Sequence, residues 1–187
     1  MTKQIMIKSG ESGEFGEFTK VINVVVQEEW YSIEQCIANP RSIYIFGDNL
    51  LRVGEAGQAS IRSCNNAIGI ATKKKPSMLK SSFFSDNEYD ILEPFLKKEM
   101  DKIVDIMFSG NVDTLVFPKD GLGTGLSRLP QKAPKVFLAL SALLYKFLIR
   151  NLLIVEDNEL SSYIELGAIL SLIIHLCLDK YLAKIFT

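Results

Sequence analysis

Apolar residues occur along the chain in several short runs and in one long periodic segment. The near-continuous apolar runs at 42–46 and 113–117 are typical of strands that are covered on both faces. Residues 87–108 instead repeat apolar positions at i, i+3 and i+4, which predicts an amphipathic helix. By the same criteria, further strands are predicted at 3–8, 20–27, 67–73 and 151–155, and further helices at 28–40, from Gly57 onward, at 133–148 and beyond 157.

Strands that alternate with helices predict an α/β sandwich with a mixed, largely parallel sheet. No low-complexity linker divides the sequence, so residues 1–155 are predicted to form one α/β domain. Residues 156–187 are predicted to form a helical C-terminal extension that packs on the same domain. Its buried face is predicted to contain Leu166, Ile169, Leu170, Ile173, Ile174 and Cys177.

Composition and charge narrow the range of partners. The 187 residues include 21 Lys+Arg and 22 Asp+Glu, and this balance gives no electrostatic reason to expect nucleic-acid binding. Three dispersed cysteines and one histidine, His175, match no metal-site spacing, so neither a metal nor a cofactor is expected. The apolar stretch 136–155 is broken by Lys146 and Arg150, and no secretory signal is visible. A cytoplasmic protein without membrane association is therefore expected.

Two of the predicted strands end abruptly in glycine-containing loops. "IYIFGDNL" (43–50) leads to Gly54 and Gly57, and "LVFPKDGLGTGL" (115–126) contains Gly121, Gly123 and Gly125. Ligands of open α/β sheets bind beyond the carboxyl ends of strands, so the two loops are predicted to lie side by side. Glycine-rich loops can present backbone N–H groups to phosphate. Two tight strand-to-helix turns are the alternative interpretation.

Polar side chains at the mouths of these loops complete the candidate site. Asp48, Asn49 and Asp120 could accept hydrogen bonds from ribose hydroxyls or orient a water, but Asp and Asn also cap helices for purely structural reasons. Lys119 and the basic run 72–75 could neutralise phosphate or simply be solvated. The predicted ligand-binding residues are Gly54, Gly57, Gln58, Ala59, Ser60, Lys73, Lys119, Gly121, Gly123, Thr124 and Gly125.

The segment "YIFGDNLLRVGEAGQASIR…NAIGIATKKKPSM…FFSD…LVFPKDGLGTGLSRLPQKAP", within residues 41–137, is similar to a family of small uncharacterised proteins of bacteria and phages. More distantly, it resembles the macrodomain superfamily. The resemblance lies in a strand that ends at Asn49, a loop that enters a helix at 54–60, and a second glycine loop at 121–125. It implies a macrodomain-like three-layer α/β/α fold. It also implies that Asn49 and the first loop hold the distal ribose of ADP-ribose, while the second loop holds the diphosphate and ribose.

These observations predict a protein that binds ADP-ribose or a related nucleotide diphosphate at the two loops. An ADP-ribosylated protein would be its substrate if it removes ADP-ribose, with Asp48, Asn49 and Asp120 as catalytic residues and either aspartate as base or substrate-orienting carboxylate. Two alternatives stay open: a non-catalytic module that sequesters a nucleotide, and an interaction protein that acts through its C-terminal helices. A Gly123→Val variant is predicted to fold and to lose ADP-ribose binding.

Overall fold

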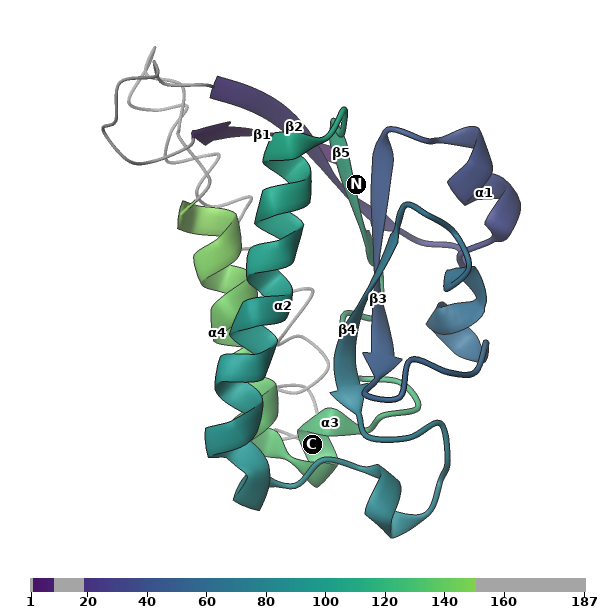
Figure 1. Ribbon diagram of the computed structural model, residues 1–187, viewed down its shortest axis with the longest axis vertical. Coiled ribbons are helices and arrows are strands. Elements are labelled where there is room, and N and C mark those ends of the chain that lie inside the picture. The colour runs from purple at the N-terminus through teal and green to yellow at the C-terminus, as the bar shows by residue number, and fades with distance from the viewer. Residues whose placement is uncertain (1, 9–18, 151–187) are drawn as a thin grey trace.

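The computed structural model describes residues 2–8 and 19–150, and these form a sheet with helices on both faces (Figure 1). The sheet has five strands in the order β1-β2-β5-β3-β4. Strands β2 to β5 run parallel to one another, and β1 pairs antiparallel with β2 at the edge. The predicted α/β class and the mixed, largely parallel sheet are therefore confirmed. The strands span Thr2–Lys8 (β1), Thr19–Gln27 (β2), Ser42–Asn49 (β3), Ala67–Lys73 (β4) and Thr114–Pro118 (β5).

The helices form two layers. The long helices α2 (Tyr89–Ser109) and α4 (Pro134–Arg150) lie side by side on one face of the sheet, as Figure 1 shows. The short helix α1 (Ile33–Ala38) and the 3-10 helix η1 (Gly57–Ile61) lie on the opposite face. The remaining elements are the helix α3 (Leu129–Lys132) and two single-turn 3-10 helices, η2 (Lys80–Ser82) and η3 (Asp86–Glu88).

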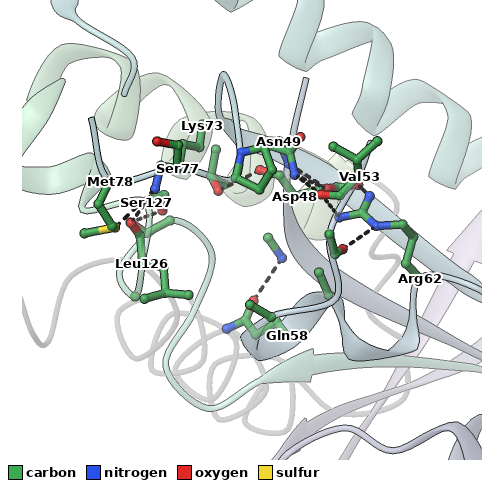
Figure 2. Close-up of a pocket in the computed structure, with 18 of the residues that line it drawn as sticks. Asp48, Asn49, Val53, Gln58, Arg62, Lys73, Ser77, Met78, Leu126 and Ser127 are labelled. Carbon is green, nitrogen blue, oxygen red and sulfur yellow. Dashed lines mark hydrogen bonds and ion pairs between the residues drawn. The ribbon is translucent and has the colours of Figure 1, made fainter. Parts of the chain in front are cut away.

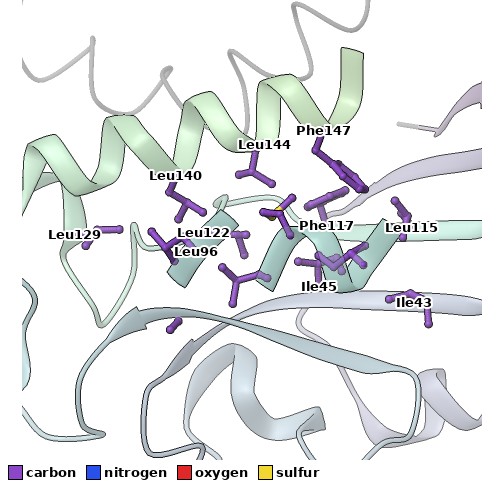
Figure 3. Packing of buried hydrophobic residues seen from close by; sticks show 14 of the residues in the cluster. Ile43, Ile45, Leu96, Leu115, Phe117, Leu122, Leu129, Leu140, Leu144 and Phe147 are labelled. Atoms are coloured by element: carbon purple, nitrogen blue, oxygen red, sulfur yellow. The ribbon is translucent and has the colours of Figure 1, made fainter. Parts of the chain in front are cut away.

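Alternate residues of the central strands face the two layers. Ile43 and Ile45 of β3 pack into the larger core, which α2 and α4 cover (Figure 3). Tyr44 and Phe46 point the other way, into the smaller core beneath α1 and η1. Because both faces of the strand are buried, its sequence is an almost unbroken apolar run, as predicted. The start of α2 is also favourable, since Ser85 forms a capping box just before it.

Several elements differ from the sequence prediction. The helix predicted at 28–40 is shorter and spans only Ile33–Ala38, and the 3-10 helices η2 and η3 were not predicted. Strand β3 continues through Asn49, three residues beyond its predicted end at 46, because β4 pairs with these residues. The predicted helix from Gly57 is a five-residue 3-10 helix, which is too short to provide a strong dipole. Helix α3 was not predicted.

The predicted strand at 151–155, the C-terminal extension and its buried face lie outside the described residues. None of the helices in residues 19–150 combines the length and hydrophobicity that a membrane span requires.

The chain connections diverge at the carboxyl ends of β3 and β5. The connection after β3 enters η1 on one face of the sheet, whereas the connection after β5 leads to α3 and α4 on the other face. Pairing between these two strands is limited to Ser42–Tyr44 with Thr114–Val116. Beyond it, the Tyr31 hydroxyl lies 3.0 and 3.2 Å from the Ile45 and Val116 carbonyl oxygens. Such a divergence is where open α/β sheets form ligand crevices.

Candidate functional site

A pocket of about 470 Å³ opens at the carboxyl ends of β3 and β4 (Figure 2). Its walls come from these strand ends, from the loops that follow β3 and β5, and from residues 76–78 after β4. Volumes of this size suit a small organic ligand. Nine residues predicted from the sequence line it: Asp48, Asn49, Gly54, Gln58, Ala59, Lys73, Asp120, Gly123 and Gly125.

The two glycine loops meet across this pocket, which confirms that they lie side by side. The amide side chain of Gln58 connects the two loops. Its Oε1 accepts a hydrogen bond from the Gly47 N–H at 2.9 Å, and its Nε2 donates to the Gly121 carbonyl at 3.3 Å. One side chain from the first loop therefore holds both the end of β3 and the second loop.

Five predicted site residues do not line the pocket. The Ser60 hydroxyl donates to the Tyr31 carbonyl at 3.3 Å, and the Thr124 hydroxyl donates to the Asp120 carbonyl, so both side chains brace the chain. Gly57 and Gly121 shape their loops with positive φ angles of 64° and 71°. Lys119 lies in a smaller adjoining hollow, together with Glu28 and Glu29; the pocket and the hollow share Trp30, Gln58 and Asp120.

Asn49 presents an unmatched acceptor in the pocket wall. Its Nδ2 donates to the Val53 carbonyl at 2.8 Å and to Asp48 Oδ1 at 3.3 Å, and these two acceptors fix which way the amide points. Its Oδ1 is then buried without a hydrogen-bond partner, in a residue that is 6% exposed. A buried polar atom without a partner costs free energy, so a ligand donor at this position would be stabilising.

Lys73 presents an unmatched charge in the same wall. It is 6% exposed, yet no carboxylate in the described part of the chain pairs with it. Its Nζ donates to the Leu126 carbonyl at 3.2 Å, lies 3.5 Å from Met78 Sδ and sits 4.4 Å from the centre of the Phe83 ring. Burial lowers the pKa of Lys73, and the nearby positive charge of Arg128 lowers it further. Buried cations usually have an anionic partner, and here the open pocket could supply one.

A β-bulge places Asn49 and Lys73 opposite each other. The register of β3 against β4 runs from Asp48–Ala71 directly to Asn49–Lys73, so Thr72 is the extra residue. The Thr72 hydroxyl donates to the Asp48 carbonyl at 3.2 Å and secures the bulge. Two neighbouring strand ends therefore place the Asn49 amide and the Lys73 ammonium group beside each other in the pocket wall.

Asp48 is held on all sides by donors. Its Oδ2 accepts hydrogen bonds from Arg62 at 2.6 Å and from Arg52 at 3.2 Å. Its Oδ1 accepts from the Asn49 backbone N–H at 2.6 Å and from the Asn49 side chain. The carboxyl group fits against β4 because residue 69 is glycine; a Cβ there would overlap with it. This geometry favours a structural role for Asp48 over that of a catalytic base.

The second loop offers backbone donors. In the described part of the chain, the amide N–H groups of residues 122–127 donate to no protein acceptor. The loop is closed instead by its carbonyls: Gly123 O accepts from the Leu129 N–H and from the Ser127 hydroxyl, both at 2.8 Å. A run of unpaired amides on a fixed loop is the arrangement that binds anions, as the glycine pattern predicts.

Exposed apolar side chains surround the mouth of the pocket. Trp30, Met78 and Leu126 are 71%, 53% and 58% exposed and line the opening. An exposed apolar rim around a polar floor suits a ligand with a flat hydrophobic part.

This rim was not predicted from the sequence, and neither were Arg62 and Ser127 in the wall. Arg62 could have been found, because it lies four residues after Gln58 and thus on the same side of the helix that the sequence predicts from Gly57. No group of acidic, His and Cys side chains in residues 2–8 and 19–150 is arranged to hold a metal ion.

The fold and the site define an α/β protein with a ligand pocket at the carboxyl end of a parallel sheet. Residues 26–143 match the model of a family described as "Family of unknown function (DUF7831)". Because this segment is more than half of the 187 residues, the chain belongs to that family. The match agrees with the resemblance to an uncharacterised family, and it gives no link to macrodomains. Neither the curated proteins nor the solved structures that were compared include a match.

Proposed function

We propose that the pocket binds ADP-ribose or a closely related nucleotide diphosphate, within a fold of the macrodomain type. The observation that carries the proposal is the presence of two unmatched polar groups in one wall. Asn49 Oδ1 requires a donor such as a ribose hydroxyl, and the Lys73 ammonium requires an anion such as a phosphate. A sugar phosphate supplies both within one molecule.

The other walls support the same class of ligand. The amides of Gly123 and of residues 125–127, which line the pocket, can donate to phosphate oxygens, as the backbone of other phosphate-binding loops does. The rim of Trp30, Met78 and Leu126 offers apolar surface on which a base could stack. Phosphate, sugar and base each therefore have a counterpart in the pocket.

Binding is tested by titrating the purified protein with ADP-ribose in a calorimeter. Replacing Lys73 with Met should weaken binding by about 10- to 100-fold, because a charge-assisted contact contributes roughly 1.5–3 kcal/mol. The matched control is Lys75→Met, since Lys75 is exposed, carries the same charge and does not line the pocket. If ADP-ribose produces no heat and no shift in melting temperature at millimolar concentration, the proposed ligand is wrong.

The pH dependence of binding is an independent test of whether the charged Lys73 side chain contacts the ligand. The Lys73 pKa is lowered below its ordinary value of 10.5 in the folded protein, and a bound phosphate would favour the charged form. ADP-ribose affinity should therefore fall as pH rises through that lowered pKa. The free energy of unfolding of the ligand-free protein should instead rise with pH over the same range, because the unfolded chain keeps the Lys73 proton up to about pH 10.5 and the folded protein releases it earlier. A Lys73→Arg variant should show neither change, since guanidinium stays charged.

The ribose hydroxyl bound by Asn49 can be identified with ADP-ribose analogues that each lack one hydroxyl. The hydroxyl bound by Asn49 Oδ1 is the one whose removal weakens binding to the wild-type protein but not to Asn49→Ala. If every analogue loses the same affinity with both proteins, Asn49 does not contact the sugar.

Hydrolysis is a second candidate function, and the position of Asp120 favours it. Asp120 lines both the main pocket and the adjoining hollow, so it stands where a nucleotide would join a larger substrate. We propose that Asp120 orients the bond to be cut when ADP-ribose is removed from a protein. An Asp120→Asn variant that still binds ADP-ribose but no longer releases it from ADP-ribosylated protein would support this role. Binding without release by the wild-type protein would leave a nucleotide-binding module.

A further inference from the structure

A chain of ion pairs connects the pocket to helix α2. Glu99 of α2 is 6% exposed and lies outside the pocket wall. One of its oxygens, Oε2, accepts a hydrogen bond from the Ala71 N–H at 2.7 Å, and the other forms an ion pair with Arg52. Ala71 belongs to β4, which is the edge strand of the sheet, so this N–H has no neighbouring strand to pair with. Glu99 is thereby fixed to both a helix and the sheet edge.

Arg52 extends the chain from Glu99 to the end of β3. Its Nη1 donates to the Gly69 carbonyl at 2.8 Å and to Asp48 Oδ2 at 3.2 Å. The backbone of Arg52 has a left-handed φ of 55°, which residues other than glycine rarely adopt. Together, Arg52 and Glu99 satisfy an adjacent carbonyl and N–H of the edge strand, as a further strand would.

Asp48 carries the connection to the Asn49 amide in the pocket wall. Its Oδ1 accepts from both N–H groups of Asn49, the backbone one at 2.6 Å and the side-chain one at 3.3 Å. Asp48, together with the Val53 carbonyl 2.8 Å from Asn49 Nδ2, therefore sets where Asn49 Oδ1 points. The two carboxylates of this network, Glu99 and Asp48, are balanced by the guanidinium groups of Arg52 and Arg62. The charges within the network therefore cancel, and it needs no ligand to balance them. Lys73, by contrast, has no carboxylate partner in the described residues.

We infer that Glu99 is a positioning residue for the ligand pocket. By holding Arg52 it adds to the hold that Arg62 has on Asp48, and through Asp48 it directs Asn49 Oδ1 toward the hydroxyl of the ligand. The inference rests on the proposed function, because it takes that hydroxyl to belong to the sugar of a nucleotide. Asn49 is the residue that contacts the ligand, whereas Glu99 acts through two intervening side chains.

The substitution that tests this role is Glu99→Gln. Glutamine keeps an acceptor for the Ala71 N–H, but it removes the negative charge that holds Arg52. We expect ADP-ribose to bind about tenfold more weakly, which corresponds to the loss of one hydrogen bond. The analogue that lacks the hydroxyl bound by Asn49 should bind as tightly as it does to the wild-type protein. A merely structural role would weaken both ligands by the same factor, and that result would overturn the inference.

The control lies near the start of the same helix. Glu88 pairs with Lys74 at 2.8 Å, outside the pocket, and glutamine can replace it in the capping box. Glu88→Gln should leave both ligands unaffected. If Glu99→Gln does not fold, Arg52→Lys gives the same test from the other partner, because lysine retains the charge and loses the forked contacts.

A ligand-free readout separates this inference from the proposed function. In nuclear magnetic resonance spectra, the side-chain NH₂ signals of Asn49 should shift in Glu99→Gln and Arg52→Lys, and should stay in place in Glu88→Gln. Unchanged Asn49 signals in both network variants would overturn the positioning role even if ADP-ribose binds. Shifted signals in a protein that does not bind ADP-ribose would support the positioning role and reject the proposed ligand.

Discussion

The two loops that enclose the pocket are held in place by different parts of the chain. In the loop after β3, side chains from the two ends of the loop bind its backbone: Arg62 donates to the Gly54 carbonyl at 2.9 Å, and Asn49 donates to the Val53 carbonyl. In the loop after β5, backbone N–H groups bind backbone carbonyls, with Gly123 O accepting from the Leu129 N–H and Gly125 O accepting from the Arg128 N–H. The hydroxyls of Ser127 and Thr124 add hydrogen bonds within the same loop. The first loop should therefore be sensitive to changes of side chain, and the second to changes of backbone conformation.

This difference separates the proposed tasks of the loops. A loop that is closed by its own carbonyls leaves its N–H groups available, which is what an anion site requires. A loop that is fixed by arginine and asparagine side chains is tied to the strand end instead, so it can place a specific acceptor such as Asn49 Oδ1. Under the proposed function, the second loop would bind the phosphates and the first would recognise the sugar.

The largest effect is expected when the side-chain anchor of the first loop is removed. Arg62→Ala leaves the buried carboxylate of Asp48 with one guanidinium partner fewer, and breaking a buried pair in this way costs about 3 kcal/mol. Arg41→Ala is the matched control, because the Arg41–Asp113 pair is exposed and should contribute less than about 1 kcal/mol. Urea unfolding measures both. Equal losses in the two variants would show that Arg62 does not anchor the loop.

The backbone of the second loop is tested with two glycines. Gly123 has a φ of 84°, and a Cβ there would lie 3.0 Å from the buried Leu129 side chain. Gly123→Ala should therefore lower the free energy of unfolding by about 2 kcal/mol. A Cβ at Gly125 would meet nothing within 4 Å, so Gly125→Ala should change stability by less than about 0.5 kcal/mol. The comparison fails if both variants unfold at the same urea concentration.

The contact with Leu129 also changes an expectation drawn from the sequence. Gly123→Val was predicted to fold and to lose only its ligand. The structure places Gly123 against the core, so valine is expected to destabilise the protein as well. Stability and binding would then fall together, which makes the Gly123→Ala and Gly125→Ala pair the cleaner test of the loop.

The strands and the meeting of the two loops could be predicted because they depend on local patterns. Apolar runs identify buried strands, and the carboxyl ends of parallel strands lie at one edge of a sheet. The length of β3 could not be predicted, since Gly47 and Asp48 are poor strand formers that are held there by Gln58 and a bulge in β4.

The hydrogen-bond partners of Asp48 could not be predicted from the sequence either. Its partners Arg52 and Arg62 come from a loop and from the turn after η1, and the space for its carboxyl group comes from Gly69. The sequence therefore suggested a catalytic carboxylate where the structure shows an anchored one. Whether Asn49 Oδ1 lacks a partner is likewise decided by the positions of its neighbours, and no spacing in the sequence reveals it.

Among the three test positions Arg62, Gly123 and Gln58, the smallest loss of stability is expected at Gln58, the side chain that joins the two loops. In Gln58→Glu, one carboxylate oxygen can still accept from the Gly47 N–H, but the other would face the Gly121 carbonyl, so that a donor–acceptor contact becomes a repulsion. Losing this single, partly exposed hydrogen bond should cost about 1 kcal/mol of stability. The added negative charge also lies in the pocket wall, where it should repel the phosphates and weaken ADP-ribose binding more than the loss of stability explains.

Gln131→Glu is the control, because it adds the same charge at an exposed position of α3 outside the pocket. Thermal unfolding and calorimetry measure the two quantities separately. If Gln58→Glu binds ADP-ribose as tightly as Gln131→Glu does, then the joint between the loops does not border the phosphate site, and the two loops act independently.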